Sequence, residues 1–306
     1  MKAADEPAQE PEVQRRDDLR IDWSENADPL YVPRGEKLVF RVRVGVGGID
    51  APVGDVTMEC GTEPYRESVL LLGASSGEAE RESAWMRLRA KGDYQLFSMD
   101  AKVESHLHPV DWPRAVYNFQ QTGSKNRRRE VLIGRQGGEP FVRYRRDSDR
   151  NAPKGTRIWK DPKERVLPVD ALDMVSAAYY ARSMAREDRL YLSFPVADKL
   201  DLWEIRLRRG KEGKQETYAG TFDAVQILLD PRPYPGEVPD DKTREKAETF
   251  EGLFGIHGSI ELWVERQTGV PVRIRGDLPV GPLDLEIDVL LKSFSGTPPA
   301  FRPLPE

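Results

Sequence analysis

Residues 36–46, EKLVFRVRVGV, decide the expected fold because apolar side chains occupy every second position. An alternation with a period of two is typical of an antiparallel strand that has one face on a core and one face in solvent. The apolar face carries Leu38, Phe40, Val42, Val44 and Val46, and the polar face carries Lys37, Arg41 and Arg43. We therefore predict a half-buried strand here.

The same period recurs in three more segments, at residues 200–208, 260–264 and 283–291. The Gln267-Thr268-Gly269 sequence predicts a tight turn into another strand at 272–275. The inward positions are Trp203, Ile205 and Leu207, then Ile260, Leu262 and Val264, and last Leu283, Leu285, Ile287, Val289 and Leu291. Weaker strand patterns lie near residues 52–60, 84–90, 94–104, 114–121, 128–134, 140–146, 156–160, 190–194 and 221–229. Short strands at near-regular spacing predict a mostly β protein, a single large antiparallel sheet that is barrel-like or wrapped.

One segment, residues 170–185 (DALDMVSAAYYARSMA), has the spacing of a helix instead. Its alanines favour helix, and its shared stripe is formed by Leu172, Val175, Ser176 and Tyr179. Asp170 is the expected N-cap, and Asp173 would add negative charge to the first turn. We expect this one substantial helix to pack on the sheet or to plug one end of a barrel.

The ends of the chain differ from its middle. Residues 1–30 hold four basic and nine acidic residues with no apolar periodicity. Such a composition buries too little to offset its ordering entropy, so residues 1–32 are predicted to be a disordered acidic tail. Residues 33–295 are predicted to be one β-rich domain, with an exposed proline-rich and charged excursion at 231–251. Residues 296–306 are predicted to be a proline-rich tail.

Composition excludes several classes of protein. The 306 residues carry a formal net charge of -5, which argues against a general nucleic-acid binder. No run approaches the roughly 18 apolar residues that a membrane helix needs. Cys60 is the one cysteine, which excludes a disulfide framework and a cysteine zinc site. No apolar signal segment follows Met1, so the chain is interpreted either as cytoplasmic or as an exported chain whose signal has been removed.

Several short motifs occur in a fixed order. They are Gly35-Glu36-Lys37-Leu38 with Gly48-Ile49 after the first strand, Asp170-Ala171-Leu172 before Tyr179-Tyr180-Ala181-Arg182, Ala219-Gly220-Thr221-Phe222, and Glu261-Leu262-Trp263-Val264 before Pro271-Val272-Arg273-Ile274. Over most of residues 35–294 the chain thereby resembles the exported bacterial proteins of domain-of-unknown-function family 3108. The resemblance implies an antiparallel, barrel-like β fold. It also implies a periplasmic or envelope location, with a signal or lipoprotein anchor removed. It brings no established activity, cofactor or catalytic residue.

The basic segment at 125–157 is the first candidate site, since it holds eleven Lys and Arg residues and four acidic ones. Arg143 and Arg145 share one face of a strand, and Val142 and Tyr144 take the other. A face lined by arginines can bind phosphate, sulfate or carboxylate groups, so an anionic lipid or an acidic saccharide is the expected ligand. The alternative is a solvated face that is neutralised by the chain's own acidic residues.

Aromatic residues near this segment form a second candidate. Tyr117 and Phe119 share a strand face and Trp112 lies close in sequence, so exposed rings there could stack on sugars. Core packing is the alternative role for these three rings.

A metal site is the third candidate. Glu104, His106 and His108 alternate, so on a strand they share one face and could hold a divalent metal that activates water. The alternative is a pair of surface histidines at a strand end, because Pro109 follows directly and the sequence has no second histidine cluster.

Catalytic motifs are missing from the sequence. No GxSxG, phosphate-binding loop or dinucleotide fingerprint occurs, and no cofactor is expected. Paired carboxylates for glycoside hydrolysis could come only from acidic strand faces, such as Asp284, Glu286 and Asp288 or Glu261. The leading hypothesis is a non-enzymatic envelope protein that binds a lipidic or saccharide component or acts as an assembly partner. The alternatives are a carboxylate-dependent hydrolase or lyase acting on envelope polysaccharide, and a purely structural interaction module.

Overall fold

All the strands join into one antiparallel sheet in the computed structural model, which describes residues 35–46, 49–64, 82–94, 97–107, 115–123, 127–147, 159–185, 190–237, 257–280 and 283–296. The order across these residues is β8-β7-β6-β5-β4-β3-β2-β1-β14-β13-β12-β11-β10-β9. The strands are β1 Lys37–Val46, β2 Ile49–Pro64, β3 Glu82–Tyr94, β4 Phe97–Leu107, β5 Ala115–Gly123, β6 Arg127–Gln136, β7 Glu139–Arg146, β8 Lys163–Val166, β9 Tyr191–Asp198, β10 Asp201–Thr217, β11 Gly220–Pro233, β12 His257–Glu265, β13 Pro271–Val280 and β14 Leu283–Ser295. Each half is a meander of sequence neighbours, and the β1–β14 pair joins the two halves. The predicted fold class is confirmed.

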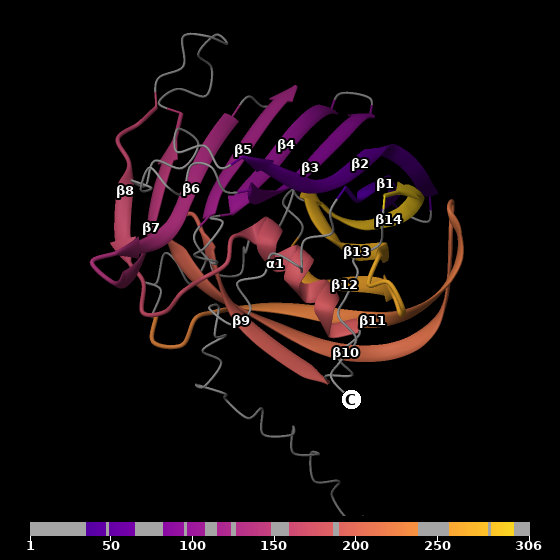
Figure 1. The fold of residues 1–306 in the computed structure, drawn as a ribbon. Coiled ribbons are helices and arrows are strands. Elements are labelled where there is room, and N and C mark those ends of the chain that lie inside the picture. The colour runs from indigo at the N-terminus through magenta and orange to yellow at the C-terminus, as the bar shows by residue number, and fades with distance from the viewer. Residues whose placement is uncertain are drawn as a thin grey trace, which may run out of the picture.

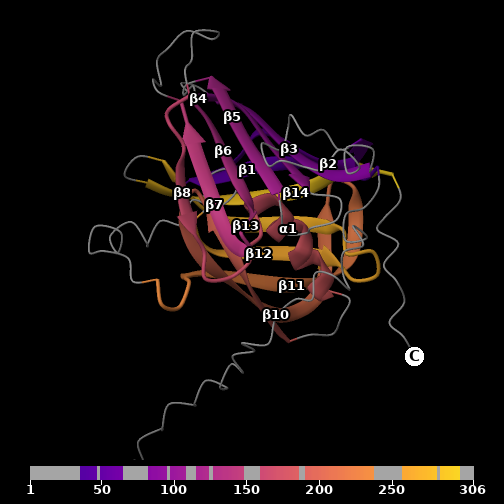
Figure 2. The same ribbon diagram turned by 60° about the vertical axis from the view of Figure 1, so that its left-hand side comes forward.

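The sheet is wrapped around the helix but is not closed (Figures 1 and 2). Strands β1–β8 lie on one side of α1 (Met174–Ala181), and β9–β14 lie on the other. The edge strands β8 and β9 do not pair with each other. The segment between β8 and α1 contacts β9, where the backbone of Leu172 forms a parallel bridge with Val196. Arg165 of β8 forms an ion pair with Glu237, which follows β11.

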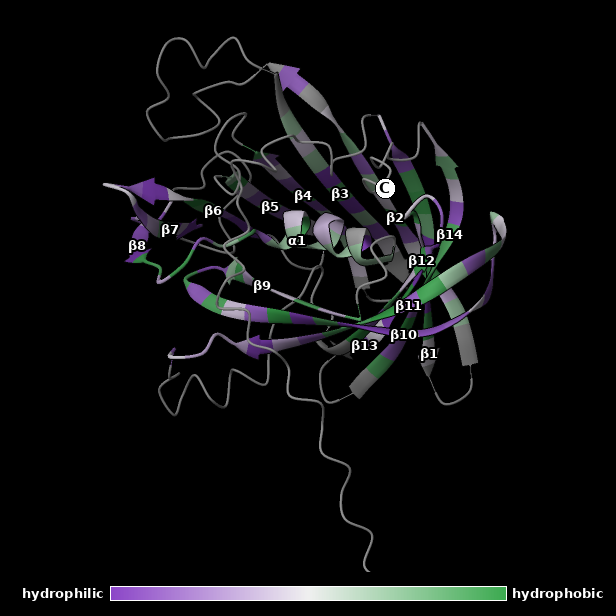
Figure 3. Ribbon diagram, turned by 60° about the horizontal axis from the view of Figure 1, so that its bottom comes forward, coloured by the Kyte–Doolittle hydropathy of each residue, from purple (hydrophilic) through white to green (hydrophobic). Residues whose placement is uncertain are grey.

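The predicted alternation places the core on the concave face of the sheet, which we call the inner face. Leu38 and Phe40 of β1 are fully buried there, and Val42 and Val44 are half-buried against the same core. The predicted inward residues of β10 and β14 are also buried, namely Trp203, Ile205, Leu207, Ile287, Val289 and Leu291. Figure 3 shows the alternation as bands of polar and apolar residues along the strands around α1.

The predicted helix is shorter than the sequence pattern indicates. Instead of 170–185, α1 covers Met174–Ala181 and is followed by a 3-10 turn at Arg182–Ala185. Asp173, not Asp170, is the N-cap. The reason is tertiary: Leu172 donates its backbone N–H to Pro195 O (3.0 Å) and accepts from Ala197 N (2.9 Å), so it is held as an extended residue. The Asp170 carboxylate instead forms an ion pair with Arg135.

The Asp173 carboxylate connects the helix to the sheet. It accepts hydrogen bonds from the backbone N–H groups of Val175 (2.8 Å) and Ser176 (3.0 Å), as a capping residue does. It also accepts from the hydroxyls of Ser176 and of Ser105 on β4, the latter at 2.6 Å. All of these side chains are buried. The cap therefore fixes both the start of the helix and its position against β4.

Two further predictions about local structure are corrected by the structure. The sequence predicts a strand at 156–160, but Trp159 forms only an isolated bridge with Asp147, and the strand lies at Lys163–Val166. The excursion predicted at 231–251 begins as strand, because β11 continues through Pro231 and Pro233, which pair with β10. The last pair of β11 with β12 is Leu229–Ile260, so these prolines interrupt no hydrogen-bonded pair with the described residues of β12. Residues 238–251 and the predicted tails 1–32 and 297–306 lie outside the described residues.

A buried ion pair joins three parts of the chain. Arg182, at the end of α1, donates from Nη1 and Nη2 to the two carboxylate oxygens of Glu36 at 2.7 and 2.8 Å. Its Nε donates to the backbone oxygen of Gly269 in the β12–β13 turn at 2.8 Å. The two side chains are only 3% and 2% exposed, so neither charge is solvated by water. Removing either side chain would leave the other charge buried without a counter-charge, which destabilises the folded state.

We predict that Arg182→Ala lowers the free energy of unfolding by about 3–5 kcal/mol, because it leaves the Glu36 carboxylate buried without a counter-charge. Denaturant unfolding followed by circular dichroism measures this. The double variant Glu36→Leu/Arg182→Met should be less destabilised than Arg182→Ala, because it buries no unpaired charge. A double variant as unstable as the sum of its two single variants would contradict this account.

The Cys60 thiol lies in the same buried cluster. Burial raises its pKa to about 12, and the nearby Glu36 carboxylate acts in the same direction. At pH 8 the thiolate fraction would then be on the order of 10⁻⁴.

We predict that a thiol-reactive disulfide reagent modifies native Cys60 at least a hundredfold more slowly than it modifies the guanidinium-unfolded chain. The control is Cys60→Ala/Ser293→Cys, which presents an exposed thiol, and equal rates for the two native thiols would refute the prediction.

Candidate binding groove

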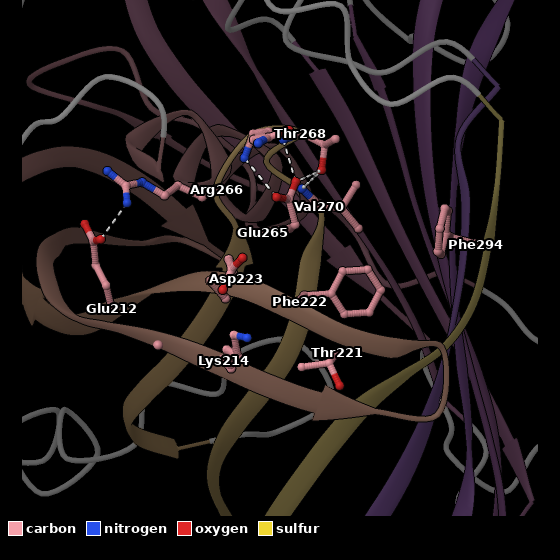
Figure 4. Close-up of a pocket in the computed structure, with 13 residues that line it drawn as sticks. Glu212, Lys214, Thr221, Phe222, Asp223, Glu265, Arg266, Thr268, Val270 and Phe294 are labelled. Carbon is pink, nitrogen blue, oxygen red and sulfur yellow. Dashed lines mark hydrogen bonds and ion pairs between the residues drawn. The ribbon is translucent and has the colours of Figure 1, made fainter.

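A groove of about 960 Å³ lies where the tip of the β10–β11 hairpin approaches the β12–β13 turn and the end of β14 (Figure 4). Its size is in the range of small-molecule binding sites. The lining residues are Glu212, Gly213, Lys214, Thr221, Phe222, Asp223, Ala224, Glu265, Arg266, Gln267, Thr268, Val270 and Phe294. Residues from three separate parts of the sheet therefore form it.

The groove exists because the long hairpin curls back onto its neighbours. Its tip is held by a bond from Ala219 N to Leu291 O (3.1 Å) and by one from Arg43 Nη1 to the Tyr218 hydroxyl (2.8 Å). Closer to its base, Arg273 Nη1 of β13 donates to Gln215 Oε1 at 3.2 Å. These contacts keep the hairpin against β1, β13 and β14 and leave a hollow beside them.

Two of the three acidic residues in the groove have structural partners. Glu212 accepts from Arg209 Nη2 (2.9 Å) and from Arg266 Nη1 (2.8 Å), and the hydrogen bond from Arg209 lowers the pKa of Glu212. Glu265 accepts from Gln267 N at 3.1 Å and from both the backbone N–H and the hydroxyl of Thr268, so it shapes the turn. These two carboxylates hold the walls of the groove in place.

The remaining polar groups are available to a ligand. Asp223 and Lys214 face each other across the hairpin and are exposed, and neither forms an ion pair with any described residue. Thr221 is exposed beside them. The Phe294 ring is 52% exposed and meets the ring of Phe222 edge-on, with centroids 6.2 Å apart. The groove thus offers an aromatic surface next to one free carboxylate, one free ammonium and one hydroxyl.

The sequence did not predict this groove. Its residues come from positions about eighty apart in the chain, and no chemical motif links them. The one signal was the Ala219-Gly220-Thr221-Phe222 segment, quoted above for the family resemblance, of which Thr221 and Phe222 line the groove. Gly220 has a φ of 131°, which explains the glycine in this tight turn but not the aromatic residue that follows it.

The predicted anion-binding arginines lie on the other side of the molecule and are held by the chain's own acidic residues. Arg143 forms an ion pair with Glu164 of β8. Arg145 Nε lies 2.6 Å from Glu130 Oε1, and its guanidinium stacks over the ring of Trp159 at 4.5 Å. An anion at this face would have to displace those carboxylates.

The predicted aromatic site is split by the structure. Tyr117 and Phe119 are each 3% exposed and belong to the core on the inner face, while Trp112 lies outside the described residues. Burial raises the pKa of the Tyr117 hydroxyl to about 12, against the opposing effect of the Arg129 guanidinium. The Phe119 ring packs below Arg127 and Arg129, at 5.2 and 4.6 Å.

The predicted metal ligands Glu104 and His106 share the outer face of β4, as their alternation requires. Glu104 forms ion pairs with Arg87 (2.5 Å) and Lys102 (2.8 Å), and His106 Nδ1 lies 3.0 Å from Glu63 Oε1. Within the part of the chain that the structure describes, no three His, Cys, Asp or Glu side chains are grouped to hold a metal ion. The third predicted ligand, His108, lies outside that part.

The acidic strand considered for hydrolysis is also engaged. Asp288 on β14 forms a bidentate pair with Arg273, at 2.7 and 2.6 Å, and Glu286 is exposed. The Asp284 side chain lies outside the described residues.

Comparison with known proteins places the chain in a family. Residues 83–288 match the model of DUF3108, a protein family of unknown function. This match covers most of the chain, which therefore belongs to that family. Arg182 and the hairpin tip lie within the match, whereas Glu36, Arg43 and Phe294 lie outside it. No match was found among the curated proteins.

One solved structure shows the same type of fold, and a second was found at a lower similarity. A β-barrel-like protein of domain-of-unknown-function family DUF1849 from Brucella abortus has a TM-score of 0.51 at 9% identity, over 87% of this chain and 99% of that one. A candidate lipoprotein from Parabacteroides distasonis has a TM-score of 0.29 at 10% identity, over 87% of this chain and 98% of that one. Among the described residues no helix has the length and apolar character to cross a membrane.

We predict that Arg145→Ala lowers the free energy of unfolding by about 1–3 kcal/mol, because it leaves the Glu130 carboxylate, 11% exposed, without its cation. Arg143→Ala is the matched control. Its partner Glu164 is 41% exposed, so the loss should stay within about 1 kcal/mol. Urea unfolding of both variants measures the difference, and equal losses would contradict the structural role of Arg145.

Proposed function

We propose that this protein is a non-enzymatic binding protein of the bacterial envelope whose groove at the β10–β11 hairpin takes a saccharide. The observation that carries the proposal is the exposed Phe294 ring beside the free Asp223, Lys214 and Thr221 side chains in a hollow of about 960 Å³. Sugars present an apolar face of C–H groups to an aromatic ring and hydroxyls to polar groups at their rim. The envelope location is the expectation that comes with the family resemblance.

The charges of the groove support an envelope saccharide that carries amino or acidic groups. The Asp223 carboxylate accepts hydrogen bonds from sugar hydroxyls and amides. The Lys214 ammonium, opposite Asp223 in the strand register, donates to a carboxylate of an acidic sugar. A lipidic ligand has less support in this groove because its walls carry five charged side chains, Glu212, Lys214, Asp223, Glu265 and Arg266.

Binding is favoured over hydrolysis by the state of the carboxylates. Glycoside hydrolysis requires an acid with a raised pKa opposite a second carboxylate. The pKa of Glu212 is lowered, and both carboxylate oxygens of Glu265 accept hydrogen bonds within the β12–β13 turn. Asp223 is the one groove carboxylate without such partners among the described residues, and a single carboxylate does not supply both roles.

We predict that Phe294→Ala weakens saccharide binding about three- to tenfold through loss of the stacking surface. Asp223→Ala should weaken it similarly through loss of an acceptor. Isothermal titration with the disaccharide of N-acetylglucosamine and N-acetylmuramic acid, and with the neutral N-acetylglucosamine disaccharide, measures this and shows whether the acidic group contributes.

The matched control is Tyr191→Ala, which removes an aromatic ring of similar exposure (48%) on β9. It should bind as the wild-type protein does. Chromatography of the saccharides after incubation should show no cleavage. Cleavage that is lost in Asp223→Ala would favour the hydrolase alternative, and no saccharide binding at all would refute the proposed function.

A further inference from the structure

An exposed aromatic ring lies at the tip of the β10–β11 hairpin, outside the lining of the groove. Tyr218 is 52% exposed, the same fraction as Phe294 at the groove rim. Of the aromatic side chains that the structure describes, one other is about half exposed, Tyr191 on the edge strand β9. Single exposed rings are common on protein surfaces, whereas neighbouring ones mark a contact surface. The role of Tyr218 therefore depends on how near it lies to Phe294.

A backbone contact brings the two rings to the same part of the molecule. Ala219, which follows Tyr218, donates its backbone N–H to Leu291 O at 3.1 Å. Leu291 lies three residues before Phe294 on β14, and Figure 4 shows the turn of the hairpin beside that strand. An extended residue is about 3.4 Å long, so the path from Tyr218 to Phe294 through this contact is on the order of 20 Å at most. A linear ligand of a few sugar units that stacks on one ring can therefore reach the other.

The Tyr218 side chain is held in place. The Thr217 hydroxyl donates to Gly220 O (2.9 Å) and accepts from Ala219 N (3.1 Å), which fixes the turn. Arg43 Nη1 of β1 donates to the Tyr218 hydroxyl at 2.8 Å. The ring is thus fixed at its backbone and at its hydroxyl while half of its surface stays exposed. A tyrosine that is already ordered loses little conformational entropy when a ligand stacks on it.

Polar groups accompany the two rings. Thr221 on the hairpin and Ser293 on β14 are exposed, and their hydroxyls both donate and accept hydrogen bonds. Sugars combine an apolar ring face with hydroxyls, which suits a surface of aromatic rings and hydroxyls. We propose that Tyr218 is a second stacking platform and that the ligand is a linear oligosaccharide that extends from Phe294 to Tyr218. This inference rests on the proposed function, because the groove at Phe294 is the first platform.

Isothermal titration with two series of oligosaccharides tests the proposal. The first series is N-acetylglucosamine with one to six units, and the second alternates N-acetylglucosamine and N-acetylmuramic acid with two to six units. A longer chain has several equivalent positions on a single short site, which raises its affinity about threefold from disaccharide to tetrasaccharide. We expect a further rise of about three- to tenfold at the length where the chain reaches Tyr218, because the second contact is made within one molecule.

Variants of Tyr218 separate stacking from a structural role. Tyr218→Ala should remove the further rise and leave the binding of short oligomers unchanged, with the fold checked by circular dichroism. Tyr218→Phe keeps the ring and removes the hydrogen bond from Arg43, so the rise should remain. Tyr191→Ala, the matched control on β9, should change the binding of no oligomer. A tyrosine that only fastened the hairpin to β1 would instead weaken short and long oligomers together in both variants.

The outcomes distinguish this inference from the proposed function. Binding of short oligomers without a further rise, or a rise that persists in Tyr218→Ala, overturns the second platform and leaves the saccharide groove standing. Equal losses in Tyr218→Phe and Tyr218→Ala have the same consequence. If no oligomer of either series binds, the proposed function and this inference fail together.

Discussion

The buried pair of Arg182 and Glu36 is the contact on which the arrangement of the fold depends. A sheet of this length can bend in many ways, and hydrophobic burial alone is non-directional. The Arg182 guanidinium requires three oxygens at defined positions, from Glu36 at the start of β1 and from Gly269 in the β12–β13 turn. Meeting that requirement brings the end of α1, the β1 end of one half of the sheet and a turn of the other half to one point. The Asp173 cap sets the other end of the helix against β4.

The regions available for binding lie away from this core. The groove is built by a hairpin that extends beyond the wrapped sheet. There the hairpin leaves polar side chains that the core does not use. The rigid interior supports this site, as scaffolds of binding proteins do. Family membership brings no function, which is left to be tested through the residues of the groove.

Much of the fold could be predicted, because burial on one face imposes a period of two that is visible in one strand at a time. The stretch 36–46 and the segments around Trp203 and Ile287 showed it directly. The helix boundary could not be predicted, because Leu172 has helical spacing but its backbone forms a bridge with Val196 of β9. That competition depends on a strand more than twenty residues away, so no local pattern reports it.

The sequence by itself determined the β class, the single helix and the presence of a basic segment, because each is a property of neighbouring residues. Only the tertiary structure decided which cations have partners. Alternation puts Arg143 and Arg145 on one face, but the acidic residues that neutralise them come from β8 and β6. The groove depends likewise on the curvature of β10–β11, which sets Phe294 beside Phe222. Pairing across strands is fixed by register and bending, and these arise from the packing of the whole chain.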